Sequence, residues 1–265
     1  MTEKEYRSHP AISRSELWKI RESPEKFKYC KENPTEPTPA LIFGQAFHKL
    51  ALQPATFSDE FAVMPQVDRR TKEGKAIWAE FCEQSTGKIV ISDEDYTRAK
   101  DMVDSLYKAP FVNKLLSGEK EKEFFWRDDL TGEECKCRAD CVSELNTVNI
   151  ITDLKSATKA DLEHFTRDAI NYGYDFQSAM YTEGVEKCTG RKYAFVFIVI
   201  EKDPPYAVNV LQADDVFVKR GKDIFRELIG IYHDCKTTGD WYGYLGKYTT
   251  INSLSLPAWL AKEIE

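Results

Sequence analysis

The stretch NIITDLKSAT, residues 149–158, decides the expected fold and site. Its branched apolar residues predict a buried β-strand, yet Asp153 and Lys155 interrupt it with two charges. Because side chains alternate along a strand, Asp153 and Lys155 point to one face, whereas Thr152 and Leu154 point to the other. Two opposite charges therefore share one side of a strand that otherwise belongs in a core.

The chain around this strand changes from helical to β-rich near residue 121. Two β-rich runs precede the stretch, and the short turns between the three runs predict an antiparallel meander. A later run of aromatic and β-branched residues predicts a central strand covered on both faces. The expected elements are strands at 121–129, 133–145, 146–156, 191–202 and 206–212, a helical stretch at 159–188 and a closing helix at 213–238.

The pattern of the N-terminal part predicts helices. Ser13 and Glu16 form a capping-box pattern that predicts a helix through about Tyr29. Further helices are expected at 41–52, around 76–84 after a basic loop at 67–75, and at 93–116. We expect one α/β domain over 1–265, with a mainly helical part at 1–120, a sheet core at 121–240 and a tail at 241–265. In that tail, Leu256, Trp259 and Leu260 form either an intersubunit contact or a contact with the chain's own core.

Composition limits the class of protein. The chain has 265 residues, 42% hydrophobic and 31% charged, with a net charge of −7. This acidity argues against a generally basic nucleic-acid-binding surface, but it allows a local cationic groove. No apolar run reaches the roughly 18 residues of a membrane span, and the first residues lack a signal-peptide core. We therefore expect a cytoplasmic protein whose seven cysteines are reduced thiols.

A second aspartate lies in the run CKCRADCV, residues 135–142. If this run is a strand beside 149–158, Asp140 and Asp153 converge on neighbouring strands. Strict alternation places small residues on the core side and charged residues on the site side. The expected core side is Cys135, Cys137, Ala139 and Cys141, and the expected site side is Lys136, Arg138 and Asp140.

Two converging carboxylates suggest a cation. They repel and raise one pKa unless a positive ion lies between them, and hard oxygen ligands suit Mg²⁺ or Mn²⁺. The carbonyl of Leu154 is a further candidate ligand. Lys155 would orient or deprotonate a metal-bound water, or stabilise charge on a phosphate. The alternative is a structural Asp–Lys ion pair, which is the better interpretation of the triplet taken alone.

Five motifs in order make the pattern specific. They are GQAFH (44–48), EKEFFW (121–126), CRADCV (137–142), IITDLKS (150–156) and FQSAMY (176–181). This order resembles the RecB-like branch of the PD-(D/E)XK nucleases, and more closely the RecE-type phage and prophage exonucleases. The resemblance extends over nearly the whole chain. It implies a restriction-endonuclease-like α/β core, with a central mixed sheet flanked by helices and a helical N-terminal extension.

The resemblance also implies roles for the residues that match the motifs. Asp140 and Asp153 become metal ligands, Lys155 the catalytic lysine, and His48 a metal ligand or phosphate contact. Without the resemblance, His48 reads as a core histidine. Gly44, one turn before His48, would allow close helix packing or leave space for substrate.

Three further site residues follow from the same resemblance. Gln177 and Tyr181 share a helix face that borders the site, where they would hold Lys155 or a phosphate. Simple packing is the alternative for Tyr181. Glu123 matches an acidic residue that accompanies the site, whereas a solvated Glu121 or Glu123 is the alternative.

Five cations are candidate DNA contacts. Arginine forks and lysine charges suit phosphates, which position a duplex without specifying its sequence. A solvated charge run is the usual explanation for such a stretch. The candidates are Arg69, Arg70, Lys72 and Lys75 in the basic loop, and Arg138 beside the site.

The expected function is metal-dependent hydrolysis of double-stranded DNA from the 5′ end, leaving 3′ tails for recombination. Mg²⁺ is the expected cofactor and Mn²⁺ a substitute, with two ions about 3.5–4 Å apart. No nucleotide-binding motif occurs, and the cysteine spacing does not suit an iron–sulfur cluster. The resemblance further implies DNA ends, a single-strand annealing protein and a homo-oligomer, commonly a ring, as partners. The alternatives are a structure-specific or restriction-like endonuclease and a catalytically silent DNA-binding component.

Overall fold

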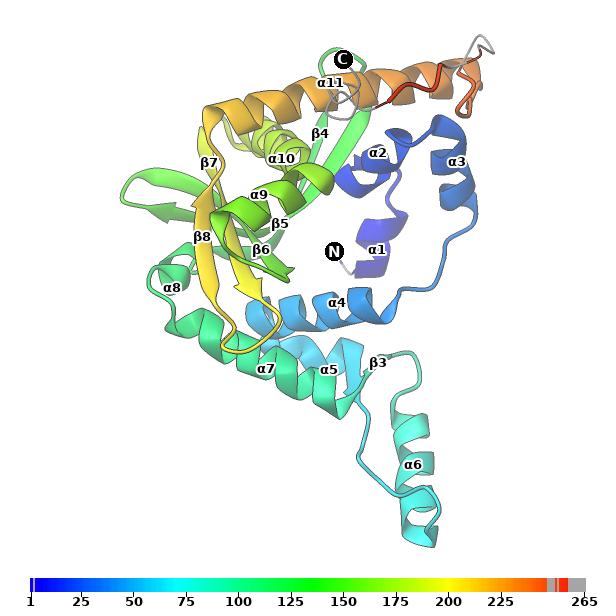
Figure 1. Ribbon diagram of the computed structural model, residues 1–265, viewed down its shortest axis with the longest axis vertical. Helices are drawn as coiled ribbons and strands as arrows, with labels where there is room; N and C mark the ends of the chain where they lie inside the picture. The colour runs from blue at the N-terminus through cyan, green and yellow to red at the C-terminus, as the bar shows by residue number, and fades with distance from the viewer. Residues whose placement is uncertain (2, 247–250, 252, 257–265) are drawn as a thin grey trace.

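A mixed six-stranded sheet forms the centre of the protein (Figure 1). The computed structural model describes residues 1, 3–246, 251 and 253–256, so Trp259 and Leu260 lie outside the described residues. Strand order is β1-β5-β6-β7-β8, with β4 paired to β5. A separate two-stranded parallel sheet joins β2 and β3. The strands are β1 (Ile12–Ser13), β2 (Phe61–Val63), β3 (Ile89–Ile91), β4 (Glu119–Arg127), β5 (Glu134–Leu145), β6 (Val148–Ala157), β7 (Tyr193–Glu201) and β8 (Val208–Gln212).

Helices cover both faces of this sheet, as the sequence predicted (Figure 1). The first core lies between the sheet and α2, α3, α9, α10 and α11, and the second lies between the sheet and α4, α7 and α8. Within the described ranges, no helix combines the length and apolar character needed to cross a bilayer. The helices are α1 (Glu3–Ser8), α2 (Arg14–Ile20), α3 (Pro24–Glu32), α4 (Pro39–Leu52), η1 (Pro54–Thr56), α5 (Phe57–Glu60), α6 (Lys72–Gln84), α7 (Asp93–Lys108), α8 (Val112–Leu115), α9 (Leu162–Asn171), α10 (Tyr174–Thr189) and α11 (Asp215–Thr238).

The predicted meander is confirmed, because β4 pairs antiparallel with β5 and β5 with β6. The predicted central strand is also confirmed, since β7 lies between β6 and β8. Three predicted helices are each divided into two. Ser23 caps a new helix at Pro24, Pro110 separates α7 from α8, and Gly173 separates α9 from α10. The short strands β1, β2 and β3 were not predicted, because two or three residues carry no periodic signal.

The strands β5 and β6 are paired over only part of their length. Their antiparallel pairing begins at Leu145 with Val148 and ends at Cys141 with Thr152. Beyond that point β6 continues alongside β7, while β5 pairs with β1 from Cys135. The term fork is used below for the point at which the pairing of β5 with β6 ends. Asp140 and Asp153 are the first residues past it on either strand.

Alternation along β5 is broken at the fork. Cys135, Cys137 and Ala139 belong to the first core, as expected, but Cys141 belongs to the second core. The expectation that Cys141 shares a face with Cys135 is therefore wrong. A strand that bends where its partner leaves does not keep the strict period of two. On β4, Glu121 lies level with Asp140, and the register of β4 with β5 passes over it. Its φ of 53° marks the same irregularity.

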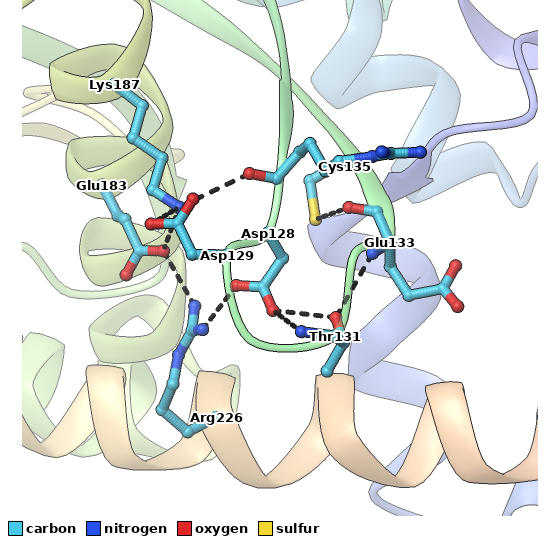
Figure 2. A network of polar contacts seen from close by, with 9 residues as sticks. Asp128, Asp129, Thr131, Glu133, Cys135, Glu183, Lys187 and Arg226 are labelled. Atoms are coloured by element: carbon cyan, nitrogen blue, oxygen red, sulfur yellow. Dashed lines mark hydrogen bonds and ion pairs between the residues drawn. The ribbon is translucent and has the colours of Figure 1, made fainter.

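The turn between β4 and β5 is held against α10 and α11 (Figure 2). The fully buried Asp128 accepts hydrogen bonds from Thr131 at 2.8 and 2.9 Å and pairs with Arg226 of α11. Arg226 also contacts Glu183 of α10 at 2.8 Å. Burial disfavours the charged form of Asp128, but Arg226 and Thr131 outweigh burial and lower its pKa. This network fixes α10, the helix that carries Gln177, relative to the sheet.

Arg226→Ala should destabilise the protein by about 3 kcal/mol, because it leaves buried Asp128 without its counterion. Arg127→Ala on the same hairpin is the matched control, since its ion pair with Glu134 is solvent-exposed and should be worth at most about 1 kcal/mol. Urea unfolding at neutral pH measures both. The difference should shrink as pH falls through the lowered pKa of Asp128. Equal effects of the two substitutions would contradict this role of the network.

Candidate active site

The two aspartates of the expected site meet at the fork. Asp140 of β5 accepts a hydrogen bond from the backbone N–H of Leu154 on β6 at 2.7 Å. This side chain thus bridges the gap at the point where the backbone ladder ends. Asp153 lies on β6 beside it, 4% exposed. The convergence of Asp140 and Asp153 on neighbouring strands is confirmed.

Lys155 lies on the same face of β6 as Asp153. Its Nζ is 2.6 Å from Oδ2 of Asp153, and its side chain is only 17% exposed. The same Nζ lies 4.5 Å from the centre of the Tyr174 ring, at the start of α10. The expected shared face of Asp153 and Lys155 is confirmed, and the ammonium is held between a carboxylate and an aromatic ring.

His48 approaches the fork from α4, on the second-core side. Its Nδ1 lies 3.5 Å from Oδ2 of Asp140, and its side chain is 31% exposed. His48 is therefore a half-buried neighbour of the carboxylate pair and not a core histidine. A Cβ on Gly44 would meet no atom of the described residues within 4 Å. Of the two explanations for Gly44, open space fits the structure and close packing does not.

Gln177 approaches from α10, on the opposite side of the sheet. Its amide Nε2 donates to Oδ1 of the buried Asp153. Tyr181, one turn later, packs edge-on against Phe195 with ring centres 6.2 Å apart. Gln177 therefore contacts the site directly, whereas the structure gives Tyr181 a packing contact within the first core.

The surroundings of the fork raise the pKa of both Asp140 and Lys155. Burial and the neighbouring charge of Asp153 raise the pKa of Asp140, and His48, Lys155 and the Leu154 N–H only partly offset this. Burial alone would lower the pKa of Lys155, but Asp153, Tyr174 and Asp140 outweigh it and the pKa is raised. Lys155 is thus an ammonium at neutral pH, and Asp140 takes up a proton more readily than a free carboxylate does.

The donors at the fork fit a hard divalent cation. The buried Oδ2 of Asp153 accepts no hydrogen bond among the described residues and relies on the charge of Lys155. In the described part of the chain, no three His, Cys, Asp or Glu side chains are grouped closely enough to enclose a metal. Mg²⁺ needs no such cage, because it keeps several waters and takes one or two carboxylates plus substrate phosphates. Asp140, Asp153, the Leu154 carbonyl and His48 are the groups that would hold it.

The remaining acidic candidate, Glu123, forms an ion pair with the first residue of the chain. Glu123 lies opposite Arg138 in the β4–β5 register, and its carboxylate is 3.7 Å from the amino group of Met1. Glu121 is the residue of β4 that lies level with Asp140, and it forms an ion pair with Arg138 at 2.8 Å. Arg138 also lies 4.9 Å from the ring of Tyr6. Arg138 is thus close to the site, with its charge partly compensated.

The basic segment lies on a projection. The helix α6 extends away from the rest of the protein (Figure 1) and begins at Lys72 after its Thr71 cap. The expected loop at 67–75 is therefore partly helical, because the side chain of Thr71 accepts from the Gly74 N–H and caps the helix. The guanidinium of Arg69 lies 4.2 Å from the Trp78 ring. The side chains of Arg69, Arg70, Lys72 and Lys75 are exposed on this projection and not at the fork.

Two residues at the start of α10 and beside it, Tyr174 and Arg14, were not predicted from the sequence. Tyr174 lies one turn before Gln177 on the same helix face, so helical spacing was the signal that could have indicated it. Arg14 of α2 donates to the carbonyl of Gly173 at 2.8 Å and has its guanidinium 6.0 Å from the Tyr174 ring. No local pattern connects Arg14 with residues 160 positions later.

Comparison with known proteins agrees with this architecture. Residues 13–253 match the family model described as PDDEXK-like domain of unknown function (DUF3799). The crystal structure of a putative exonuclease from Eubacterium rectale matches with a TM-score of 0.63 and 15% identity, covering 98% of this chain and 97% of that chain. The structure of SSO0001 matches with a TM-score of 0.32 and 13% identity, over 72% and 86% of the two chains. No curated protein matches. The first structural match shows a shared fold.

Proposed function

We propose that this chain, which belongs to the PDDEXK-like family DUF3799, is a metal-dependent deoxyribonuclease. One observation supports this most: Asp140, Asp153 and Lys155 gather at the fork with Gln177 and His48 beside them. A structural ion pair would need Asp153 and Lys155 alone. It would not need Asp140, a second, half-buried carboxylate that repels the first.

The protein's own groups have distinct tasks in this proposal. Asp140 and Asp153 would hold Mg²⁺, or Mn²⁺ as a substitute, through their negative oxygens, and the ion would supply a Lewis acid for the phosphate and for a water. Gln177 orients Asp153 through its amide. Lys155 carries a positive charge in the metal-free protein, and in this proposal it stabilises negative charge on the phosphate oxygens.

The finer part of the proposal concerns substrate and partners. The resemblance to RecE-type enzymes supports resection of duplex ends from the 5′ side, leaving 3′ tails for recombination in the bacterial or phage-infected cytoplasm. A single-strand annealing protein and further copies of the chain, in a ring, would be its partners. Lys72, Lys75, Arg69 and Arg70 on the α6 projection are the proposed contacts to duplex phosphates. Arg138 is the proposed contact beside the fork.

Binding of Mg²⁺ should release protons in mildly acid buffer. The raised pKa of Asp140 means that a bound cation must displace its proton. Affinity should therefore fall as pH falls through that pKa, and proton release should vanish above it. Titration calorimetry in two buffers of different ionisation enthalpy measures the protons released. Binding enthalpies that do not depend on the buffer at any pH would contradict the assignment of Asp140.

One incubation separates the candidate activities. End-labelled linear duplex and covalently closed circular duplex are incubated with the protein, with Mg²⁺ or with EDTA. An exonuclease shortens the linear DNA from its 5′ end and spares the circle, whereas the endonuclease alternative cuts both. A silent DNA-binding protein retards the linear duplex in a gel and cuts neither. Cleavage that persists in EDTA would overturn the metal-dependent proposal.

A further inference from the structure

We propose that Tyr174 is a positioning residue for Lys155, and that its ring face holds the ammonium of Lys155 at the fork. This inference rests on the proposed function, because Lys155 is the catalytic lysine there. The ammonium lies 4.5 Å from the ring centre, within the range of a cation–π contact. Lys155 is 17% exposed, so this contact forms in a site largely shielded from water.

The backbone around Tyr174 fixes where the ring lies. Gly173 adopts φ +66, a left-handed conformation that favours glycine, and the helix α10 begins directly after it. A Cβ on Gly173 would lie 2.4 Å from the Trp18 ring, so α2 packs directly on this turn. Arg14 of α2 donates to the carbonyls of both Tyr172 and Gly173. The chain before Tyr174 is thus tied down from a second element.

The ring is also confined by its neighbours. Phe165 of α9 and Phe197 of β7 lie 5.9 and 5.8 Å from it, centre to centre. Arg14 lies 6.0 Å from the ring centre, so Tyr174 has two cations nearby. An aromatic residue held in this way presents a fixed face to Lys155.

The contact of Lys155 with Tyr174 matters because Asp153, which forms the ion pair with Lys155, is also a proposed metal ligand. Asp153 neutralises Lys155 through the same Oδ2 that lacks any other donor among the described residues. If that carboxylate also held a divalent cation, its attraction for the ammonium would be weaker. The uncharged ring of Tyr174 does not bind the cation through its face and keeps its contact with Lys155. Tyr174 thus holds the ammonium where a phosphate would lie.

Packing alone is the competing explanation, and ring electronics separate the two. Phenylalanine and 3,4,5-trifluorophenylalanine at position 174 fill similar space, but fluorine withdraws charge from the ring face and weakens its attraction for a cation. With Mg²⁺ and duplex DNA, Tyr174→Phe should keep kcat within about twofold, and the trifluoro ring should lower kcat about tenfold without changing KM. Equal kcat for the two rings would overturn the proposal.

Tyr174→Leu and Phe165→Leu form a matched pair for stability. Both remove a ring from one aromatic cluster, but only Tyr174 contacts Lys155. Both should lower the free energy of unfolding to a similar extent, and only Tyr174→Leu should lower kcat, again about tenfold. A similar fall of kcat in both variants would assign Tyr174 to packing.

A measurement without catalysis tests the contact even if the nuclease proposal fails. In metal-free protein labelled with ¹³C-lysine, the ring current of Tyr174 should shift the ε-methylene protons of Lys155 upfield. The signal is assigned by its loss in Lys155→Arg. The shift should remain in Tyr174→Phe and disappear in Tyr174→Leu. An unshifted signal in the wild type would refute the positioning contact, whereas absent hydrolysis with a shifted signal would refute the proposed function alone.

Discussion

Asp140→Asn should abolish hydrolysis and, at neutral pH, stabilise the metal-free protein. Loss of a metal-binding carboxylate should reduce kcat at least about 10³-fold, in line with the loss of transition-state charge stabilisation. The gain in stability follows from the raised pKa of Asp140. A group whose pKa is higher in the folded state stabilises the fold only while protonated, and this contribution is lost as pH rises through the folded pKa. Asparagine removes the remaining repulsion with Asp153.

The magnitude of the stability gain is about 1 kcal/mol, a usual size when a strained functional group is neutralised. Urea unfolding in EDTA at neutral pH measures it, and Glu144→Gln, on the exposed end of the same strand, is the matched control. The control should change neither stability nor cleavage. A loss of stability in Asp140→Asn would contradict the expected repulsion between Asp140 and Asp153, and misfolding would then explain its loss of activity.

Lys155→Ala should lower kcat about 10²- to 10³-fold, because an ammonium positioned for transition-state charge is removed. It should also destabilise the metal-free protein by about 3 kcal/mol, since Asp153 is left buried without its cation. A divalent ion would replace the missing charge. Mg²⁺ should therefore raise the Tm of Lys155→Ala more than it raises that of the wild type.

Differential scanning calorimetry with and without Mg²⁺ checks this compensation. Lys159→Ala, an exposed lysine just beyond β6, serves as the control and should behave as the wild type. An equal response of Lys155→Ala and wild type to Mg²⁺ would indicate that the cation and the ammonium do not share a carboxylate. The proposed link between Lys155 and the metal would then be wrong.

The sequence predicted the pairing of Asp153 with Lys155 because alternation along one strand needs no tertiary information. The approach of Asp140 followed from the expected meander, which the structure confirms. The fork did not follow. The pairing of β5 with β6 stops at Cys141 and Thr152, and beyond these residues β5 pairs with β1 and β6 pairs with β7. No local sequence pattern encodes this change of partner strands. For this reason the assignment of Cys141 to the first core was wrong.

Contacts between segments far apart in the chain could not be predicted from the sequence either. Arg14 reaches Gly173 only because α2 packs beside α10, and Glu123 meets Met1 only because the chain start returns to β4. Gln177 at Asp153 agrees with the resemblance that placed it at the site. The roles of these residues in hydrolysis stay predictions until they are measured.

We propose that the carboxylates meeting at the fork hold a divalent ion next to Lys155. Anomalous diffraction from crystals soaked in Mn²⁺ tests it most directly. We expect a peak in contact with both Asp140 and Asp153, lost in Asp140→Asn crystals. Fully occupied Mn²⁺ elsewhere on the protein, with none at these two side chains, would contradict the claim.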